Sequence, residues 1–197
     1  MVIGVTGRSC SGKDEVVHLL EERGLESVNV DKLGHRALEM NKERLFASFG
    51  PSIFDKDGKV DRKVLGPIVF SSPEKLEELN NITHPWMVEE VEAFIRERKI
   101  AVINAALLES MNLVPLCDNI LYVYAPLDLR KERAVKRDGL SEEAFLKRNE
   151  SQKEIGSTLF ESGKRVITII NDKDREYLYR QVAAYCDILL RRGYLDE

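Results

Sequence analysis

Residues 2–15 read VIGVTGRSCSGKDE, and this stretch decides the fold of the chain. Val2–Thr6 is a short apolar run typical of a buried strand, and a segment of helical period begins at Lys13. Between them, Gly7–Lys13 fits the pattern G-x-x-x-x-G-K of a phosphate-binding loop. Its glycines let successive backbone N–H groups point at phosphate oxygens, and the helix N-terminus adds positive dipole character. The stretch therefore predicts a nucleotide-binding α/β domain in which Lys13 bridges the β- and γ-phosphates.

Asp14 departs from that pattern, because a Ser or Thr hydroxyl normally follows the lysine and ligates Mg²⁺. A carboxylate is also a hard oxygen ligand for Mg²⁺, and it suits the first turn of a helix. Without the metal, its charge would repel the nucleotide phosphates. We therefore expect nucleotide binding that depends steeply on Mg²⁺; the alternative is a loop that has lost its catalytic chemistry.

The composition is that of a globular protein with one α/β domain and small insertions: 197 residues, 43% of them hydrophobic and 32% charged. The net charge of −4, with acids and bases interspersed, argues against broad nucleic-acid binding. No apolar run is long enough for a membrane span, and the N-terminus lacks the basic segment of a signal peptide. We expect a cytoplasmic protein without a nucleic-acid or membrane partner; the oligomeric state stays open and is compatible with a monomer.

The three cysteines are odd in number and widely spaced, so we expect neither a disulfide framework nor a zinc site. They are Cys10, Cys117 and Cys186. Buried or loop thiols are the favoured interpretation. Cys10 lies inside the phosphate loop, where a reactive, partly exposed thiol is a side hypothesis.

Five short apolar runs alternate with charged segments of helical period, which predicts βαβ units and parallel strands buried on both faces. Single helices are expected over Lys13–Arg23 and Lys173–Arg192. The expected fold is α/β, with one five-stranded parallel sheet flanked by helices. The strands are expected at Val2–Thr6, Ser27–Val30, Ile100–Asn104, Ile120–Tyr124 and Val166–Ile170.

Two insertions interrupt this alternation. About seventy residues separate the second and third expected strands, far more than one crossover helix needs, so we expect a helical subdomain there. Within it, Ser72 and Pro73 open a helix by N-cap and first-position preferences. After the fourth strand, a segment rich in Arg and Lys predicts two helices joined at Asp138–Gly139, with Ser141 capping the second.

Four further stretches, in order along nearly the whole chain, resemble the dephospho-CoA kinase family, which catalyses the last step of coenzyme A synthesis. They are VNVDKLGHRAL (28–38), DGKVDRKVLGPIVFSSPEKLEELNNITHPWM (57–87), AALLESMNLVPLCDNILYVYAP (105–126) and RKERAVKRDGLSEEAFLKRNESQ (130–152). The resemblance implies a P-loop kinase that uses ATP and Mg²⁺ to phosphorylate the ribose 3′-hydroxyl of dephospho-CoA. It implies a nucleotide-binding core of 1–31, 98–126 and 156–197, a helical substrate-binding subdomain of 32–97, and a helical lid of 127–155.

The resemblance also implies roles for single residues. Asp31 falls on a family Asp after the second strand, where a carboxylate can accept the hydroxyl proton and orient the oxygen for in-line attack. A helix N-cap is the competing structural role of Asp31, and the two roles can coexist. Arg137 matches the lid arginine and Arg133 lies one turn earlier, so their guanidinium groups would close over the transferring phosphoryl group, unless they are ordinary surface cations.

The implied catalytic residues are thus Lys13, Asp31 and Arg137, with Asp14 as the metal ligand. The implied ATP site comprises Gly7, Ser9, Cys10, Ser11, Gly12, Lys13, Asp14, Glu15, Arg133, Arg137 and Asn171. The implied substrate site comprises Thr6, Asp31, His35, Arg62, His84 and Leu108. Structural roles compete at three of these positions: strand-end packing for Thr6, capping or packing for His84, and pairing with Asp31 for His35.

The chain departs from the family pattern at two amides. Asn29 replaces the first Asp of D-x-D, and Asn104 replaces the Asp that ends the third strand near the metal. The family's Pro becomes Ala106, and its Phe-Glu becomes Glu109–Ser110. Two carboxylates are therefore lost while Asp14 adds one, and we hypothesise that these changes compensate for one another.

Two other functions stay open. The chain could instead be a P-loop kinase for a nucleoside monophosphate or a small metabolite, or a nucleotide-binding protein without transferase activity. The size of the long insertion and its DR…VF…HP pattern favour dephospho-CoA as the acceptor. The joint presence of Lys13, Asp31, Arg133 and Arg137 argues against a site without activity.

Overall fold

A computed structural model describes residues 1–195. The chain divides into two compact units: Met1–Asn29 together with Phe94 onward, which we call the core unit, and Val30–Ala93, which we call the helical unit. The bounds of the helical unit differ by a few residues from those of the expected subdomain, 32–97. None of the helices formed by residues 1–195 is both long and apolar enough to span a membrane.

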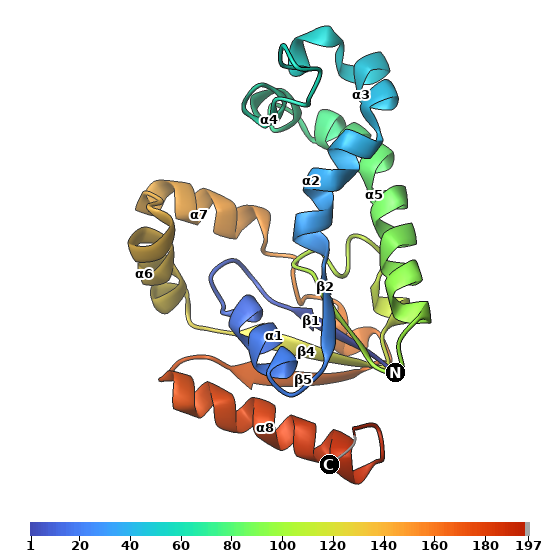
Figure 1. The fold of residues 1–197 in the computed structure, drawn as a ribbon. Coiled ribbons are helices and arrows are strands. Elements are labelled where there is room, and N and C mark those ends of the chain that lie inside the picture. Colours follow the sequence, from blue (N-terminus) through green and yellow to red (C-terminus); the bar gives the residue numbers. More distant parts are fainter. Residues whose placement is uncertain (196–197) are drawn as a thin grey trace. The chain divides into compact units, whose positions relative to one another are not determined.

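The core unit is built on a five-stranded parallel sheet with the strand order β2-β3-β1-β4-β5 (Figure 1). The predicted fold class is confirmed, and each strand begins within one residue of its expected start. The strands are β1 (Val2–Thr6), β2 (Glu26–Asn29), β3 (Ala101–Asn104), β4 (Asn119–Tyr124) and β5 (Arg165–Ile170). The near-continuous apolar runs of β1, β3 and β4 explain this arrangement, because the three inner strands of such a sheet are covered on both faces.

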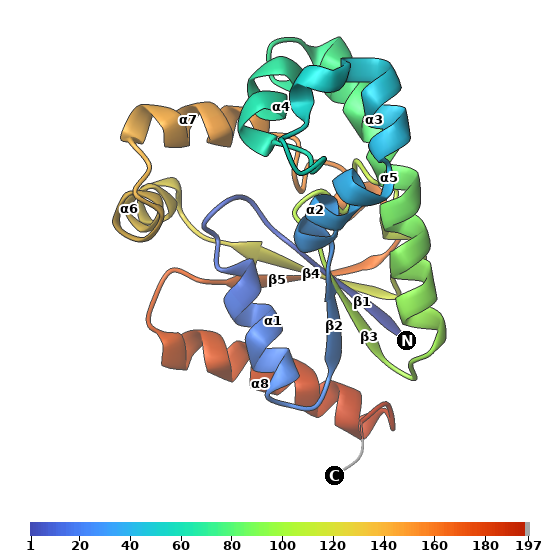
Figure 2. The ribbon, with the colours of Figure 1, turned by 45° about the horizontal axis from the view of Figure 1, so that its top comes forward.

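Two helices cover one face of this sheet. Both views of the ribbon show α1 (Lys13–Glu21) and α8 (Arg175–Arg191) on the same side (Figure 2). The buried side chains of the two helices join those of β1, β3, β4 and β5 in one apolar cluster. Each helix is shorter than expected: α1 ends two residues before Arg23, and α8 begins at Arg175, where the Asp174 carboxylate accepts from the Tyr177 N–H at 2.8 Å.

The predicted helix-capping residues are confirmed. Ser72 Oγ accepts from the Lys75 N–H at 3.3 Å at the start of the long helix, and Ser141 Oγ accepts from the Ala144 N–H at 3.1 Å. Gly139 ends the preceding helix with a positive φ of 64°. The remaining helices are α2 (Val30–Met40), α3 (Lys42–Phe49), α4 (Arg62–Val69), α5 (Pro73–Arg96), α6 (Leu127–Asp138) and α7 (Glu142–Ser151), with 3₁₀ turns at Pro51–Ile53, Val114–Leu116 and Leu159–Glu161.

The helical unit has an apolar core of its own, and its long helix α5 contains a proline. Pro85 lies inside α5 and has no N–H, so the carbonyl of Asn81, four residues earlier, lacks its helical donor. The Arg44 guanidinium of α3 supplies one, since it donates to the carbonyls of Asn81 and Ile82 at 3.4 Å each. Arg44 therefore compensates for the proline of the His-Pro pair.

Replacing Arg44 with Ala should lower the free energy of unfolding by about 1 kcal/mol, because two carbonyls lose a charged donor. Urea denaturation followed by circular dichroism measures the loss, with Lys63→Ala, an exposed cation of the same unit, as the matched control. A Pro85→Ala background restores the N–H opposite Asn81, so Arg44→Ala should cost less there. An equal cost in both backgrounds would contradict the compensating role.

Candidate nucleotide site

The loop between β1 and α1 is shaped by two glycines that have no room for a side chain. Gly12 precedes α1 with φ 95°, a conformation that L side chains rarely adopt, and a Cβ there would lie 2.0 Å from the Asn171 amide nitrogen. A Cβ on Gly7 would lie 2.5 Å from the Val123 carbonyl oxygen of β4. The Ser11 hydroxyl, buried in this loop, has no hydrogen-bond partner among the described residues. The loop is thus a tight cradle with an unsatisfied polar group, as expected of a phosphate site.

The outer side of the loop is held by hydrogen bonds to its carbonyl groups. Asn171 Nδ2, just after β5, donates to the Ser11 carbonyl at 2.8 Å. The Arg133 guanidinium of α6 donates to the carbonyls of Cys10 and Ser11 at 3.4 and 3.5 Å, and to the Asn171 carbonyl at 3.1 Å. In this structure Arg133 fixes the loop backbone, and its expected closure over the phosphoryl group stays a prediction.

Two further side chains hold the first half of the loop. Gln152, just after α7, accepts from the Ser9 N–H at 2.8 Å through Oε1. Arg130 is buried in α6, and its guanidinium donates to the Ser9 carbonyl at 3.4 Å and to the Asn149 side chain at 2.8 Å. Sequence reasoning assigned these residues no role. The family-like stretch 130–152 contains both residues, but nothing in its pattern shows which way they point.

Lys13, Asp14 and Asn104 meet where α1 begins and β3 ends. The Lys13 ammonium donates to Asn104 Oδ1 and lies 3.3 Å from Asp14 Oδ1, while Asn104 Nδ2 donates to that same Asp14 oxygen at 2.9 Å. Burial alone would raise the pKa of Asp14, but the Asn104 hydrogen bond and the Lys13 charge outweigh it and lower that pKa below its ordinary value. Asp14 is therefore a carboxylate at neutral pH.

A cavity of about 560 Å³ opens beside the loop, in the core unit. Its two acidic lining residues are already paired: Glu15 accepts from Arg175 at 2.6 Å, and Glu132 from Lys136 at 2.5 Å. The remaining charged residues of the lining are cations, so the cavity favours an anionic ligand. The lining residues are Cys10, Gly12, Glu15, Leu129, Glu132, Arg133, Lys136, Arg137, Asn171, Lys173, Arg175 and Leu178.

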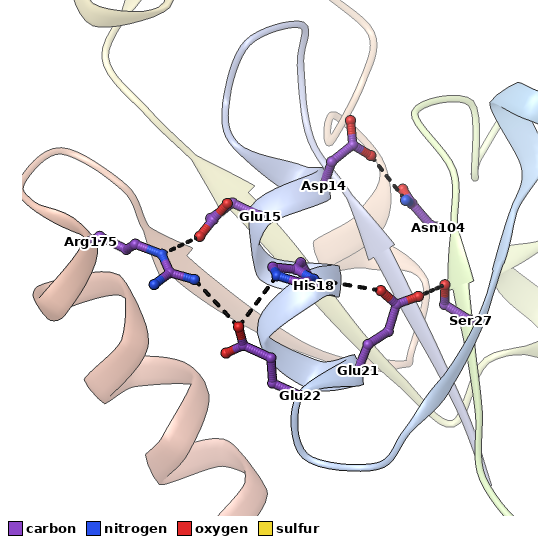
Figure 3. A network of polar contacts seen from close by, with 8 residues as sticks. All are labelled: Asp14, Glu15, His18, Glu21, Glu22, Ser27, Asn104 and Arg175. Atoms are coloured by element: carbon purple, nitrogen blue, oxygen red, sulfur yellow. Dashed lines mark hydrogen bonds and ion pairs between the residues drawn. The ribbon is translucent and has the colours of Figure 1, made fainter.

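The pair of Glu15 and Arg175 belongs to a wider surface network that ties α1 to α8 (Figure 3). Arg175 also lies 3.5 Å from Glu22, which in turn lies 3.3 Å from His18 Nε2. Arg175 closely follows the Asn171 turn that borders the cavity. The network therefore fixes the wall of the cavity to the helix that carries Lys13.

Arg137 stands exposed at the end of α6, also on the cavity lining. It donates to both carboxylate oxygens of Asp138, at 2.7 and 3.2 Å, and the Cys10 thiol donates to the same carboxylate at 3.6 Å. All three cysteines are free thiols in the structure. Arg137 is thus positioned beside the loop but paired within α6.

Two of the residues that were predicted to bind the substrate are buried in the core unit. Thr6 is fully buried, and its hydroxyl donates to the Ala106 carbonyl at 3.2 Å, which is the strand-end packing role. Leu108 is also fully buried, and its side chain packs on Gly4, where a Cβ would lie 2.9 Å from Leu108 Cδ2. Neither side chain is exposed to solvent.

The other substrate residues belong to the helical unit. His35 Nε2 and Arg62 Nη1 are hydrogen-bonded to each other, which brings together residues from α2 and α4. His84 is half-buried in α5, and this burial lowers its pKa, so it is neutral at pH 7. Asp31 is the second residue of α2, because the helix begins at Val30; the alternative N-cap role was wrong, and Asp31 is a first-turn acid.

Glu109, which was noted in the sequence only as a departure from the family pattern, has a clear structural role. Its carboxylate accepts from the N–H groups of Gly156 and Thr158 at 2.5 and 3.1 Å, and from the Thr158 hydroxyl at 2.6 Å. Gly156 has φ 87° and lies against the Tyr122 ring. Glu109 therefore fixes the chain where it leaves α7 toward β5.

Similarity to known proteins shows the family to which the chain belongs. A family model described as dephospho-CoA kinase matches residues 1–169. The chain belongs to the dephospho-CoA kinase family. A family member from Borreliella burgdorferi is 32% identical over 186 residues, which cover 92% of this chain and 91% of the relative.

Two solved structures have a similar fold over nearly the whole chain. The crystal structure of TT1252 from Thermus thermophilus has 29% identity and a TM-score of 0.82, over 96% of this chain and 97% of the other. The dephospho-CoA kinase from Campylobacter jejuni has 26% identity and a TM-score of 0.64, over 95% and 96% of the two chains. The family match thus extends to the whole architecture.

A P-loop kinase of this family implies a divalent cation bound together with ATP. Within residues 1–195, no three His, Cys, Asp or Glu side chains gather to hold a metal by themselves. Asp14, however, presents a carboxylate on a side chain that is 72% exposed. Mg²⁺ is commonly bound by one or two carboxylates together with substrate phosphates and water, so the Asp14 carboxylate fits the cation.

The Gly12 contact yields a test of the cradle. Gly12→Ala should lower the free energy of unfolding by about 3 kcal/mol, because it adds a strained φ to a clash with Asn171. Gly24→Ala is the matched control: its φ is 82°, but nothing lies within 4 Å of the added Cβ, so it should cost only about 1 kcal/mol.

The double variant Gly12→Ala/Asn171→Ala separates the two contributions in the same denaturation experiment. Removing the Asn171 amide relieves the clash, although it also removes the hydrogen bond to the Ser11 carbonyl. The two substitutions should therefore cost less together than the sum of their separate costs. Additive costs, or equal costs for Gly12→Ala and Gly24→Ala, would show that the close approach does not constrain the loop.

Proposed function

We propose that this chain transfers the γ-phosphoryl group of ATP to the ribose 3′-hydroxyl of dephospho-CoA, giving coenzyme A and ADP. The single observation that carries the proposal is the anchored phosphate loop with Lys13 and Asp14 at its end, in a chain of the dephospho-CoA kinase family. The cation-lined cavity beside the loop is large enough for part of a nucleotide. The fold alone would not select this acceptor, because many kinases share it.

In this proposal the loop and Lys13 provide electrostatic stabilisation. The Ser9 and Ser11 N–H groups already donate to Gln152 and to the Arg8 carbonyl. The other backbone N–H groups of the loop and the Ser11 hydroxyl donate to phosphate oxygens, and the Lys13 ammonium bridges the β- and γ-phosphates. Asp14 would hold Mg²⁺, which neutralises phosphate charge when it is bound. Glu15 and Asn171 border the ATP site through their places on the cavity wall.

Asp31 is the proposed general base. The chain reaches it only two residues after Asn29, the last residue of β2, whose register partner is Asn104. Two residues span at most about 7 Å, so Asp31 stays near this end of the sheet. A first-turn carboxylate there can accept the proton of the attacking hydroxyl and orient its oxygen.

Arg137 is proposed to move from Asp138 to the transferring phosphoryl group when ATP and acceptor are bound. An exposed ion pair such as that with Asp138 is weak, so exchange for a phosphate costs little. Arg133 contributes by keeping the loop in shape. The pair of His35 and Arg62, with His84, is proposed to contribute to acceptor binding in the helical unit; location in the cytoplasm stays a prediction.

The deciding experiment is ADP release from ATP and Mg²⁺ with purified protein. Turnover is expected with dephospho-CoA and not with AMP or shikimate, and the product should carry the new phosphate on the 3′-oxygen by phosphorus NMR. Turnover confined to a nucleoside monophosphate would assign another kinase activity. ATP binding without turnover on any acceptor would assign a nucleotide-binding protein.

Asp31→Asn should reduce kcat by a factor of about 10² to 10⁴ and leave the KM for ATP nearly unchanged, because the amide cannot accept the proton. Asp128→Asn is the matched control, since Asp128 is likewise the second residue of its helix, α6, and is exposed. Both variants lose a first-turn charge. Similar kcat values for the two would refute the role of Asp31 as a base.

A further inference from the structure

Asn104 lies between a cation and an anion. Its side-chain oxygen accepts from the Lys13 ammonium, and its side-chain nitrogen donates to Asp14 Oδ1 at 2.9 Å. The Lys13 ammonium and that Asp14 oxygen are themselves 3.3 Å apart. The three side chains therefore form a closed triangle in which every contact joins a donor to an acceptor.

An amide is well suited to this position, because it carries an acceptor and a donor on one planar group. An aspartate at position 104 could still accept from Lys13. It would, however, replace the donating nitrogen with an oxygen that faces the Asp14 carboxylate, and two like charges at that distance repel each other. An apolar residue would leave both Lys13 and Asp14 without this partner.

The three side chains of the triangle differ in burial, and this difference fixes the orientation of Asp14. Asn104 is 3% exposed at the end of β3, and Lys13 is 8% exposed at the start of α1, so both are fixed by the core. The Asp14 side chain is 72% exposed. Figure 3 shows one Asp14 oxygen directed at Asn104 and the other directed away from it. One oxygen is therefore tied to the core while the other stays available.

We propose that Asn104 is a positioning residue that holds Lys13 and Asp14 as one unit, with the second Asp14 oxygen turned outward for the cation that accompanies the nucleotide. This unit accommodates a single carboxylate. A carboxylate at position 104 becomes acceptable when position 14 supplies a donor, so the roles of the two positions are exchangeable. The inference rests on the proposed function only in that a nucleotide binds with a divalent cation; the acceptor plays no part in it.

The test is a double-mutant cycle on ADP affinity, measured by calorimetry with MgCl₂ and again with EDTA. Asn104→Asp and Asp14→Ser should each weaken binding of ADP with Mg²⁺ about tenfold, the first by repulsion and the second by loss of the carboxylate. Independent effects would multiply to about a hundredfold. The double variant Asp14→Ser/Asn104→Asp should instead bind within about threefold of the original protein, since the serine hydroxyl introduced at position 14 then donates to the carboxylate at position 104.

With EDTA, Asn104→Asp should weaken ADP binding more than it does with MgCl₂, because no cation offsets the added charge. Asn112→Asp is the matched control: Asn112 is exposed, and its φ of 54° suits Asp, so the same charge is added outside the site. It should bind ADP as the original protein does. Melting temperatures of all variants establish that each one is folded.

If Asn104→Asp does not fold, the cycle of Asn104→Ala and Asp14→Ala replaces it, because neither substitution adds charge. The double variant should then be no weaker than the weaker single one. Multiplicative effects in either cycle, or unchanged ADP affinity in Asn104→Asp, would overturn the inference. Coupling without turnover on dephospho-CoA would reject the proposed acceptor alone, and turnover with multiplicative effects would reject the positioning role alone.

Discussion

The parallel pairing of β1 with β3 is the constraint on which the site depends. Its register places Val5 opposite Asn104, so β3 ends beside the point where β1 gives way to the loop. The loop then returns Lys13 to that same edge, where its ammonium meets Asn104. A sheet with β1 at its centre thus gives the loop neighbours on both sides: β3 supplies the amide, and β4 supplies the carbonyl that excludes a side chain on Gly7.

The loop is also held from outside by its carbonyl groups, since Arg133 and Asn171 bind those of Cys10 and Ser11. Fixing a backbone costs about 1–2 kcal/mol per residue. Because the protein has already met that cost on folding, less binding free energy is lost when a phosphate enters the cradle.

Local and periodic features of this protein could be predicted from its sequence, whereas contacts across the fold could not. Apolar runs placed the five strands, and Ser72 and Ser141 marked helix starts, because burial and capping act over a few residues. The loop, with its glycines and Lys13, could equally be predicted from its sequence pattern. The contacts of Arg133 with the loop were not predicted, because Cys10 and Ser11 lie over a hundred residues away in the chain and no local rule selects them.

The same limit applies to the positions of single side chains. Leu108 and Thr6 lie in family-like stretches, but their burial depends on how β1 packs on the segment after β3. Asp31 was read as a possible cap because helix starts are uncertain by one or two residues. Asn104 and Glu109 appeared only as departures; their partners became evident once the strand ends were brought together.

The positive charges around the loop favour affinity for a nucleotide, whereas the negative charge of Asp14 favours selectivity. The fixed N–H groups, Lys13 and the cations of the cavity attract any polyphosphate. Asp14 opposes this attraction, and its lowered pKa means that the opposition persists at neutral pH. In the proposed site, a divalent cation on the outward oxygen of Asp14 would reverse the sign of that contribution, because its positive charge would offset that of the carboxylate. A hydroxyl at position 14 could ligate the cation without penalising its absence. On this proposal the carboxylate would make the loop more selective for the cation-bound nucleotide than a loop with Ser or Thr. Asn104 hydrogen-bonds to both Lys13 and Asp14 without adding a second negative charge.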